Sequence, residues 1–222
     1  MKAIEHLYQP PVDVALHIYY EDEHLLVVEK PAGLLSVPGR GQDKQDSLIH
    51  RLQDSYPCAV VVHRLDMDTS GLMVFARGKP AQRELSRLFQ HRQVHKAYMA
   101  LVAGRVMSES GRIELPLITD WPRRPLQKVD PEHGKPALTR YRVLEYDVAS
   151  DVTRVRLEPE TGRSHQLRVH MQQLGHPILG DRLYAGPEGR SRSPRLCLHA
   201  VELAFHHPIT GLSLDFCSTA PF

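Results

Sequence analysis

Short runs of hydrophobic residues, many of them alternating with polar positions, recur along this chain and predict mostly β-structure. The runs are rich in Val, Leu and Phe and are bounded by Pro, Gly, Asp or Lys, as strands usually are. We predict strands at residues 24–29, 60–62, 72–75, 96–103, 138–146, 152–157, 196–205 and 212–216. The connection at residues 207–211 has the composition of a hairpin turn.

Three segments instead carry hydrophobic residues three or four positions apart, which predicts helices. They run from residue 46 or 47 to 55, from Pro80 to about residue 90, and from Ser164 to residue 174. Pro80 suits the start of a helix because its missing N–H needs no partner there, and Ser164 can cap its helix. Segments 36–45, 119–136 and 186–193 show neither pattern and are predicted to be loops.

Many strands with few helices predict an α+β fold with a mixed, mostly antiparallel sheet. Residues 1–18 contain two prolines and little periodicity, so we interpret them as an extended lead-in. Residues 19–222 then form a single domain in this interpretation, since no repeat or low-complexity tract divides them.

Composition excludes several classes of protein. The 222 residues are 41% hydrophobic and 24% charged, which is ordinary for a globular chain. No hydrophobic run approaches a membrane span and the N-terminus lacks a signal-peptide pattern, so we expect a cytoplasmic protein that does not enter a membrane. Three scattered cysteines argue against a disulfide framework and a zinc ribbon, and we expect no metal site.

The net charge is only +2, but the basic residues are unevenly distributed. They gather in residues 77–96, 123–128 and 190–195. In the helix predicted after Pro80, Arg83 and Arg87 fall on the side opposite the apolar positions. Such an edge can bind a phosphate backbone, whereas the simpler alternative is a solvated helix surface.

Residues 63–71 read His-Arg-Leu-Asp-Met-Asp-Thr-Ser-Gly and form a polar turn between two predicted strands. Asp, Ser and Gly are common in turns, and an Arg near an Asp is often only a surface ion pair. Connections held between rigid strands are also common positions for functional groups. Composition alone leaves a plain turn and a catalytic turn equally open.

The order of residues in this turn resembles the signature His-Arg-Leu-Asp-x-x-Thr-Ser-Gly of the RluA family of pseudouridine synthases. All seven specified positions match, and the resemblance continues through residues 29–34, Tyr98 and residues 161–170. It covers the chain from about residue 20 to its end. It implies a bent mixed sheet whose cleft holds RNA. Larger members carry an N-terminal S4 RNA-binding domain, for which the lead-in is too short.

The resemblance implies three catalytic residues. Asp66 occupies the position of the family's nucleophile, and Arg168 that of the guanidinium that pairs with it. Such a cation lowers the pKa of a carboxyl group and keeps it ionised. Tyr98 would stack on the uracil and could take the proton from C5. Asp68 is the competing carboxylate, but it occupies a variable position of the motif.

Further residues are candidates for contact with the substrate. Arg64 lies two positions before Asp66, so an extended backbone would place both side chains on one face. The resemblance implies that Arg64 fills the space left by a flipped base. His63 is included among the substrate-facing candidates, although a structural role is the simpler interpretation for it. Arg163 and His165 are candidates for phosphate contact, with the orientation of neighbouring residues as the alternative role.

These observations predict a monomeric isomerase that converts uridine to pseudouridine in RNA without a cofactor. The N-glycosidic bond breaks and a bond to C5 forms, with no redox step. Whether the Asp attacks C1′, attacks C6 or assists glycal formation stays open. The short chain and residues 35–40 and 120–122 look most like the family member that acts on 23S rRNA and tRNA. The alternative is an inactive RNA-binding or RNA-chaperone protein, and an RNA hydrolase ranks third.

Overall fold

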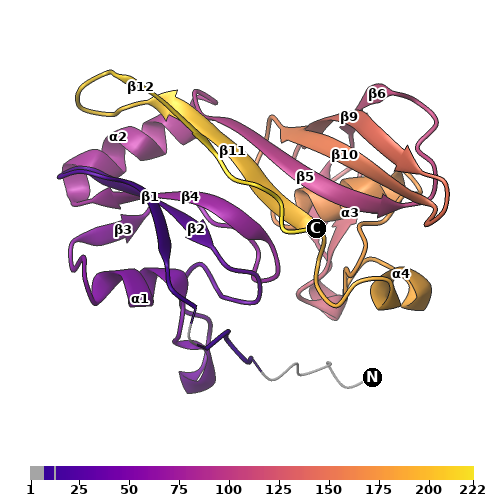
Figure 1. Cartoon of the computed structure of the whole chain (residues 1–222), viewed down its shortest axis with the longest axis horizontal. Coiled ribbons are helices and arrows are strands. Elements are labelled where there is room, and N and C mark those ends of the chain that lie inside the picture. Colours follow the sequence, from indigo (N-terminus) through magenta and orange to yellow (C-terminus); the bar gives the residue numbers. More distant parts are fainter. Residues whose placement is uncertain (1–7, 13) are drawn as a thin grey trace. The chain divides into compact units, whose positions relative to one another are not determined.

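The computed structural model describes residues 8–12 and 14–222. Its strands are β1 (His17–Glu21), β2 (Leu25–Lys30), β3 (Ala59–Val61), β4 (Ser70–Arg77), β5 (His95–Ala103), β6 (Ser110–Glu114), β7 (Leu117–Thr119), β8 (Gln127–Val129), β9 (Leu138–Asp147), β10 (Val152–Pro159), β11 (Leu198–His206) and β12 (Ser213–Cys217). Its helices are α1 (Leu48–Gln53), α2 (Lys79–Gln90), α3 (Gln166–Gln173) and α4 (Pro187–Ser191), with 3₁₀ turns η1 (Gln42–Lys44) and η2 (Trp121–Arg123). Figure 1 shows these elements.

The chain divides into two compact units. The central unit comprises Ala97–Leu198 and Phe222, and the N-terminal unit comprises the described residues up to Lys96 together with His199–Pro221. Residues 1–7 and 13 of the predicted lead-in lie outside the described residues. Within the lead-in, the buried Tyr8 hydroxyl donates to the carbonyl of Asp46 at 2.9 Å and anchors this part of the chain.

The N-terminal unit is built on the strand order β1-β2-β4-β11, with β3 beside β4 and β12 beside β11. Strands β4 and β11 run parallel, and the other pairs are antiparallel. Helix α2 packs on β4 because Ala81 and Leu85 join the buried side chains of β2 and β4 in one hydrophobic cluster (Figure 1). This packing holds the residues that flank the 63–71 turn.

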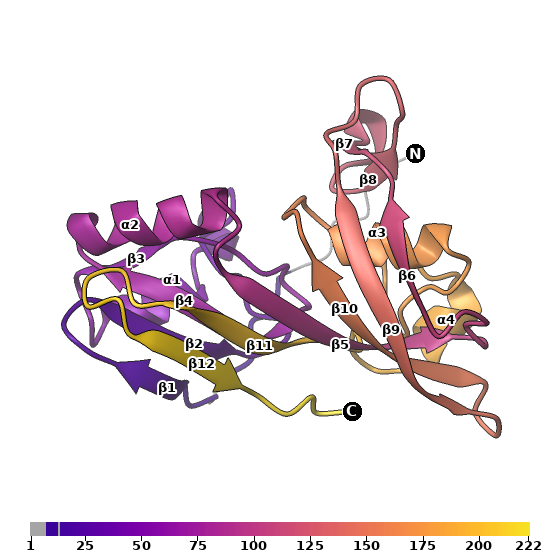
Figure 2. The same cartoon turned by 90° about the horizontal axis from the view of Figure 1, so that it is seen from above.

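The central unit contains the antiparallel order β5-β10-β9-β6. One face of these strands packs against α3, where Val155 and Leu157 join Leu167 and Met171 in a buried cluster. Figure 2 shows β9 and β10 side by side. Because side chains alternate along a strand, the neighbouring positions of β9 and β10 point to the opposite face.

The strands predicted from hydrophobic patterning and the mixed, mostly antiparallel sheet are confirmed, as are helices corresponding to α1 and α2. The inward-facing residues predicted for these two helices are buried or packed against the core; they are Leu48, Ile49, Leu52, Ala81, Leu85, Leu88 and Phe89. Among the described residues, no helix is long and apolar enough to cross a bilayer.

Two predicted loops contain regular structure, so those predictions are wrong in part. In segment 119–136, β8 pairs with β7 because Leu126 and Val129 pack on a small cluster that includes Val169 and Tyr184. In segment 186–193, Pro187 begins the five-residue helix α4. Elements this short show no hydrophobic period, so the sequence pattern does not reveal them.

The predicted start of α3 is also wrong. The helix begins at Gln166 with His165 in the N-cap position, and no side chain caps it. Instead, the Gln166 side-chain oxygen accepts hydrogen bonds from the Arg163 N–H at 3.0 Å and the Thr161 hydroxyl at 2.7 Å. These bonds fold the Thr-Gly-Arg turn back on the first residue of the helix, and Ser164 stays exposed.

Gly71 is required where β4 runs beside β11. Its φ is +112°, a region that only glycine adopts easily, and a Cβ atom there would overlap the backbone of Ala200. We expect Gly71→Ala to lower the free energy of unfolding by at least about 2 kcal/mol, because both the strain and the overlap must be relieved. Urea denaturation measures this loss. Gly186→Ala, at a position with no atom within 4 Å, should cost far less.

Candidate active site

The loop that carries Asp66 is fixed at the residue before it. The buried Ser36 hydroxyl donates to the carbonyl of Leu65 at 2.7 Å and accepts the Leu65 N–H at 3.1 Å. One side chain therefore satisfies both backbone groups of a buried residue that forms no strand or helix. Because buried backbone groups need partners, this contact determines the path of the loop.

The residue after Asp66 is fixed as well. The carbonyl of Met67 accepts the Gly33 N–H at 2.9 Å and the Lys30 ammonium at 2.8 Å. Lys30 is fully buried and also donates to the carbonyls of Pro31 and Leu34, at 2.8 and 2.7 Å. The segment around residues 30–36 therefore holds the backbone on both sides of Asp66.

We expect Ser36→Ala to reduce the single-turnover rate of the expected uridine isomerisation by about ten- to a hundredfold, because small displacements of a reacting group are costly. It should also lower the free energy of unfolding by about 1–3 kcal/mol, since Leu65 would keep unpaired buried groups. Rapid-quench kinetics and urea denaturation measure the two effects. Ser55→Ala, at an exposed serine, is the matched control. If Ser36→Ala lowered the free energy of unfolding but kept the wild-type rate, the contact between Ser36 and Leu65 would serve stability only.

A buried hydrogen-bond chain holds the end of the same turn. The Ser70 hydroxyl lies 2.7 Å from Nδ1 of His199, and Nε2 of His199 lies 2.8 Å from the Ser218 hydroxyl. Ser218 donates its only proton to the Glu29 carboxylate at 2.7 Å. His199 therefore carries a proton on Nε2, and in its neutral form it accepts from Ser70. This chain joins β2, β4 and β11 beneath the turn.

Within the turn, burial alternates between successive residues. Arg64 is exposed, Leu65 is buried, and Asp66 is partly exposed. That Arg64 and Asp66 share a face stays a prediction. His63 packs inward instead: its Nε2 accepts the Val74 N–H at 3.1 Å.

The ring of His63 is also stacked on Phe89 of α2, with 4.5 Å between centroids. Burial, together with the charge of Lys96, lowers the pKa of His63 to about 3. The histidine is therefore neutral and serves as a packing residue that ties the turn to α2. This geometry favours the structural role for His63 over contact with the substrate.

Tyr98 lies on β5 in the central unit and is partly buried. It is the direct cross-strand partner of Leu157, so both side chains lie on the face of the strands that packs against α3. The ring packs against the hydrophobic cluster that includes Leu167. These packing contacts hold the Tyr98 ring in place on a rigid strand, as stacking against a base requires.

Arg168 is buried in α3 and is held by a partner that the sequence did not indicate. Its Nε and Nη2 donate to the two carboxylate oxygens of Asp181 at 2.8 and 2.7 Å. Burial disfavours the charged form of Asp181, but the Arg168 guanidinium and the N–H groups of Leu183 and Tyr184 outweigh it and lower the pKa of Asp181. The Arg168 guanidinium also lies 5.1 Å from the centroid of the Tyr184 ring.

Tyr184 connects the Arg168–Asp181 pair to His165, one of the residues predicted to contact the substrate. Its hydroxyl lies 2.6 Å from Nδ1 of His165 and accepts the Gln127 N–H at 2.8 Å. Arg163 is exposed, and its Nε donates to the carbonyl of Pro136 at 3.1 Å. His165 therefore belongs to the structure that supports Arg168, whereas Arg163 lies at the surface.

The arginines of α2 lie where the sequence predicts them. Both Arg83 and Arg87 are exposed on the side of the helix that faces away from the core. Arg87 lies 3.0 Å from Glu84, one turn earlier, with both side chains largely in solvent. Such an exposed pair is weak and leaves the guanidinium available to a phosphate.

Sequence reasoning missed Asp181, Ser36 and His199, and it placed Lys30 in the resemblance without a role. Ser36 contacts a residue 29 positions away, His199 contacts one 129 positions away, and Asp181 lies in a loop with no periodic pattern. Lys30 and Ser36 both lie in segments that the resemblance covers, but no pattern in the sequence assigns either of them a role. The predicted catalytic residues are divided between the units: Asp66 belongs to the N-terminal unit, and Tyr98 and Arg168 belong to the central unit.

Comparison with known proteins identifies the class of this fold. Residues 24–173 match the family described as RNA pseudouridylate synthase. The chain belongs to this family. It is 55% identical over 215 residues to the dual-specificity RNA pseudouridine synthase RluA of Escherichia coli (strain K12), covering 97% of this chain and 98% of the relative. It is 56% identical over 204 residues to RluA of Vibrio vulnificus (strain CMCP6), covering 90% and 82%.

A solved structure agrees with this family membership. The chain matches human RNA pseudouridylate synthase domain containing 1 with a TM-score of 0.79 and 34% identity, over 96% of this chain and 87% of the human chain. The α+β pseudouridine synthase fold and the resemblance to the RluA family, both predicted from the motifs, are thereby confirmed. The predicted enzyme class, an RNA pseudouridine synthase, is confirmed by the same relatives and the same family match.

Proposed function

We propose that this protein isomerises uridine to pseudouridine in structured RNA with Asp66 as the nucleophile. The observation that carries the proposal is the anchoring of residues 65 and 67, which holds the backbone of Asp66 from both sides. Such preorganisation is what a reacting group needs, and a plain surface turn does not require it. The carboxylate acts by breaking the bond between N1 of uracil and C1′.

The remaining steps follow from the structure of pseudouridine, in which C5 of uracil is bonded to C1′. After the N1–C1′ bond breaks, the uracil rotates, a C5–C1′ bond forms, and the proton on C5 is released. Tyr98 would stack on the extruded uracil, since base stacking on an aromatic ring contributes about 1–3 kcal/mol. Its hydroxyl is then the candidate acceptor for the C5 proton.

Arg168 supplies the positive charge in this proposal. Asp181 accepts hydrogen bonds from two nitrogens of the Arg168 guanidinium, so the fold fixes the orientation of this charged group. We propose that this oriented guanidinium is the positive charge that the catalytic Asp of this family requires. Asp181 is thus a positioning residue that acts through Arg168.

Substrate binding would use exposed basic side chains. Flipping the target uridine out of its stack costs on the order of a few kcal/mol, and Arg64 would fill the space that the base leaves. Arg83 and Arg87 on α2, with Arg163 near α3, would contact phosphates. We propose 23S rRNA and tRNA as the RNA substrates, because the RluA relatives are named dual-specificity RNA pseudouridine synthases.

Release of tritium from uridine labelled at C5 tests the activity directly. The protein is incubated with labelled transcripts of a tRNA anticodon stem-loop and of a 23S rRNA hairpin, and the released label is counted. We expect release from both RNAs. Release from only one would restrict the substrate range, and binding without release would favour the RNA-chaperone alternative. A shortened transcript on a gel would indicate hydrolysis instead.

A further inference from the structure

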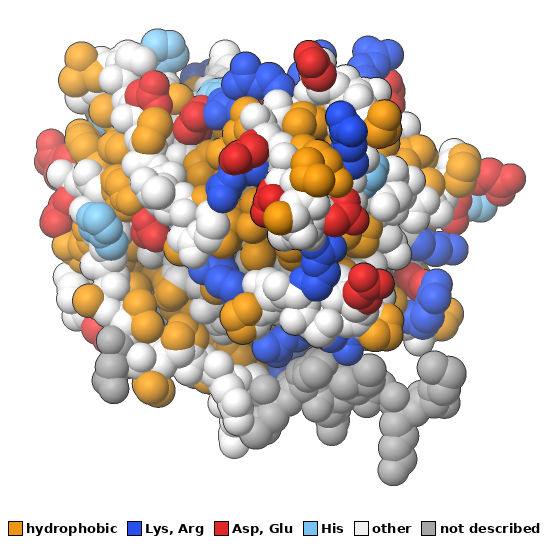
Figure 3. Space-filling view, turned by 45° about the vertical axis from the view of Figure 1, so that its right-hand side comes forward, with side chains coloured by type: hydrophobic (Ala, Val, Ile, Leu, Met, Phe, Trp, Pro, Cys, Tyr) orange, Lys and Arg blue, Asp and Glu red, His pale blue; other side chains and the backbone are white. Residues whose placement is uncertain are grey.

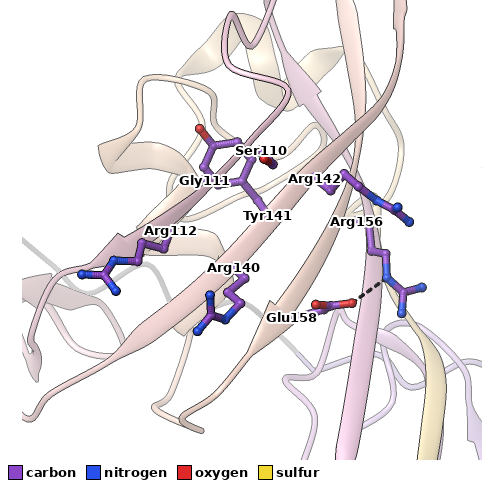
Figure 4. A pocket seen from close by; sticks show the side chains of 8 residues that line it. All are labelled: Ser110, Gly111, Arg112, Arg140, Tyr141, Arg142, Arg156 and Glu158. Atoms are coloured by element: carbon purple, nitrogen blue, oxygen red, sulfur yellow. Dashed lines mark hydrogen bonds and ion pairs between the residues drawn. The ribbon is translucent and has the colours of Figure 1, made fainter.

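A hollow lined by arginines lies on the central unit, on the face of the strands opposite α3. It has a volume of about 560 Å³ and is lined by Ser110, Gly111, Arg112, Arg140, Tyr141, Arg142, Arg156 and Glu158. These residues come from β6, β9 and β10, as Figure 4 shows. None of them belongs to the predicted catalytic set or to the basic segments recognised in the sequence.

The strand register places these side chains in two rows. In the first row, Arg142 lies directly opposite Ser110 on β6 and Arg156 on β10. In the second row, Arg140 lies directly opposite Arg112 on β6 and Glu158 on β10. Each row therefore contains an arginine paired across strands with another arginine.

Two like-charge pairs on one face are not explained by the stability of the sheet. Like charges directly opposite each other destabilise a strand pair, where a favourable pair contributes about 0.2–1 kcal/mol. The residues on the other face of the same strands, such as Tyr141 and Val155, are buried in the core and fix the register. The arginines are thus held together by packing that lies beneath them.

Nearby carboxylates neutralise the arginines only in part. Arg156 donates to Glu158 at 2.8 Å, the dashed line in Figure 4, and Arg140 donates to Glu160 at 2.6 Å. The Arg112 guanidinium lies 3.6 Å from the Glu114 carboxylate, with both side chains largely in solvent. Arg142 is exposed and forms no ion pair with any residue that the structure describes. On the face shown in Figure 3, blue and red side chains are interspersed.

We propose that this hollow binds the phosphate backbone of the RNA outside the segment that carries the target uridine. The inference rests on the proposed function for the identity of the ligand. The guanidinium group is planar and matches phosphate oxygens in a bidentate geometry. Positions two residues apart on a strand are separated by about 6.8 Å, so the two rows can contact different phosphates.

The position of Tyr98 separates this surface from the reacting base. Tyr98 lies opposite Leu157 and faces α3, whereas Arg156 is the neighbouring residue on β10 and points to the other face. A nucleotide bound at the arginines is therefore not the one that stacks on Tyr98. The surface therefore contributes to affinity for RNA without contacting the base that stacks on Tyr98.

The double variant Arg112→Gln/Arg142→Gln tests this proposal, because it removes one arginine from each like-charge pair. Binding to a fluorescein-labelled tRNA transcript is measured by anisotropy over a range of salt concentrations. We expect the slope of log K against log salt to become shallower by about 1.4–1.8, and affinity at 0.15 M salt to fall about tenfold. The thermal stability should be equal to or higher than that of the wild type.

The control Arg105→Gln/Lys135→Gln removes the same charge from exposed positions of the central unit and should leave the slope nearly unchanged. The single-turnover rate at saturating RNA should also stay unchanged in the double variant. A wild-type slope in Arg112→Gln/Arg142→Gln would overturn the proposal. Failure of the proposed function would be recognised separately, because the wild-type protein would then bind RNA without releasing tritium.

Discussion

Replacing Asp66 with Asn should abolish pseudouridine formation, with a fall in the single-turnover rate of at least about 10⁴-fold. Asn has nearly the same shape as Asp but carries no negative charge and is a poor nucleophile. Ser36, Lys30 and Gly33 bond the backbone groups of Leu65 and Met67, so these anchors remain in the variant. Tritium release under single-turnover conditions, with enzyme in excess over RNA, measures the loss.

Asp68→Asn is the matched control for this prediction. It makes the same chemical change two residues along the same turn, and we expect a rate within about threefold of the wild type, as for a residue without a role in the transition state. Both variants should bind the RNA with unchanged affinity. If Asp66→Asn released tritium at the wild-type rate while Asp68→Asn did not, the nucleophile would have been assigned to the wrong carboxylate.

Replacing Asp181 with Ala should have the largest effect on stability, a loss of about 3–5 kcal/mol in the free energy of unfolding. Arg168 is 3% exposed and would keep a buried charge without its bidentate partner. Urea denaturation measures the loss. Asp215→Ala, at an exposed aspartate of β12, should change stability by less than about 0.5 kcal/mol.

The effect of Asp181 should depend on pH in a defined direction. Its pKa is lower in the folded protein than its ordinary value of 3.8, because Arg168 outweighs the effect of burial. The stabilisation by the carboxylate is therefore fully present above pH 3.8 and is lost as the pH falls through the folded pKa. The stability difference between wild type and Asp181→Asn should shrink over that acidic range.

Asp181→Asn also tests the positioning role. It keeps the shape of the side chain and weakens its hold on Arg168, so we expect slower turnover with RNA affinity retained. A stability loss with a wild-type rate would mean that Asp181 supports the fold only. Combining Arg168→Ala with Asp181→Ala should cost less stability than the sum of the single changes, since the two residues share one interaction.

The local hydrophobic pattern was sufficient to predict the main helices and strands. The alternation in β9 and β10 and the helical spacing in α2 come from the need to bury one face of each element, and that need is visible in any window of ten residues. The short strand β8 was missed because its packing depends on Val169, Tyr184 and other distant residues. The helix α4 was missed because five residues are too few to show a hydrophobic period. The start of α3 was misplaced because the Gln166 side chain bonds Thr161 and Arg163, and this contact is not visible in the hydrophobic pattern.

The sequence by itself determined the family, the enzyme class and the order of the strands along the chain. Matched motifs and the periodic burial of side chains depend only on the order of residues, so both can be recognised without the tertiary structure. Only the tertiary structure decided what holds those motifs in place. Ser36 reaches Leu65, His199 reaches Ser70 and Asp181 reaches Arg168. Each contact joins segments that folding alone brings together, and a buried polar group accepts whichever partner the packing provides.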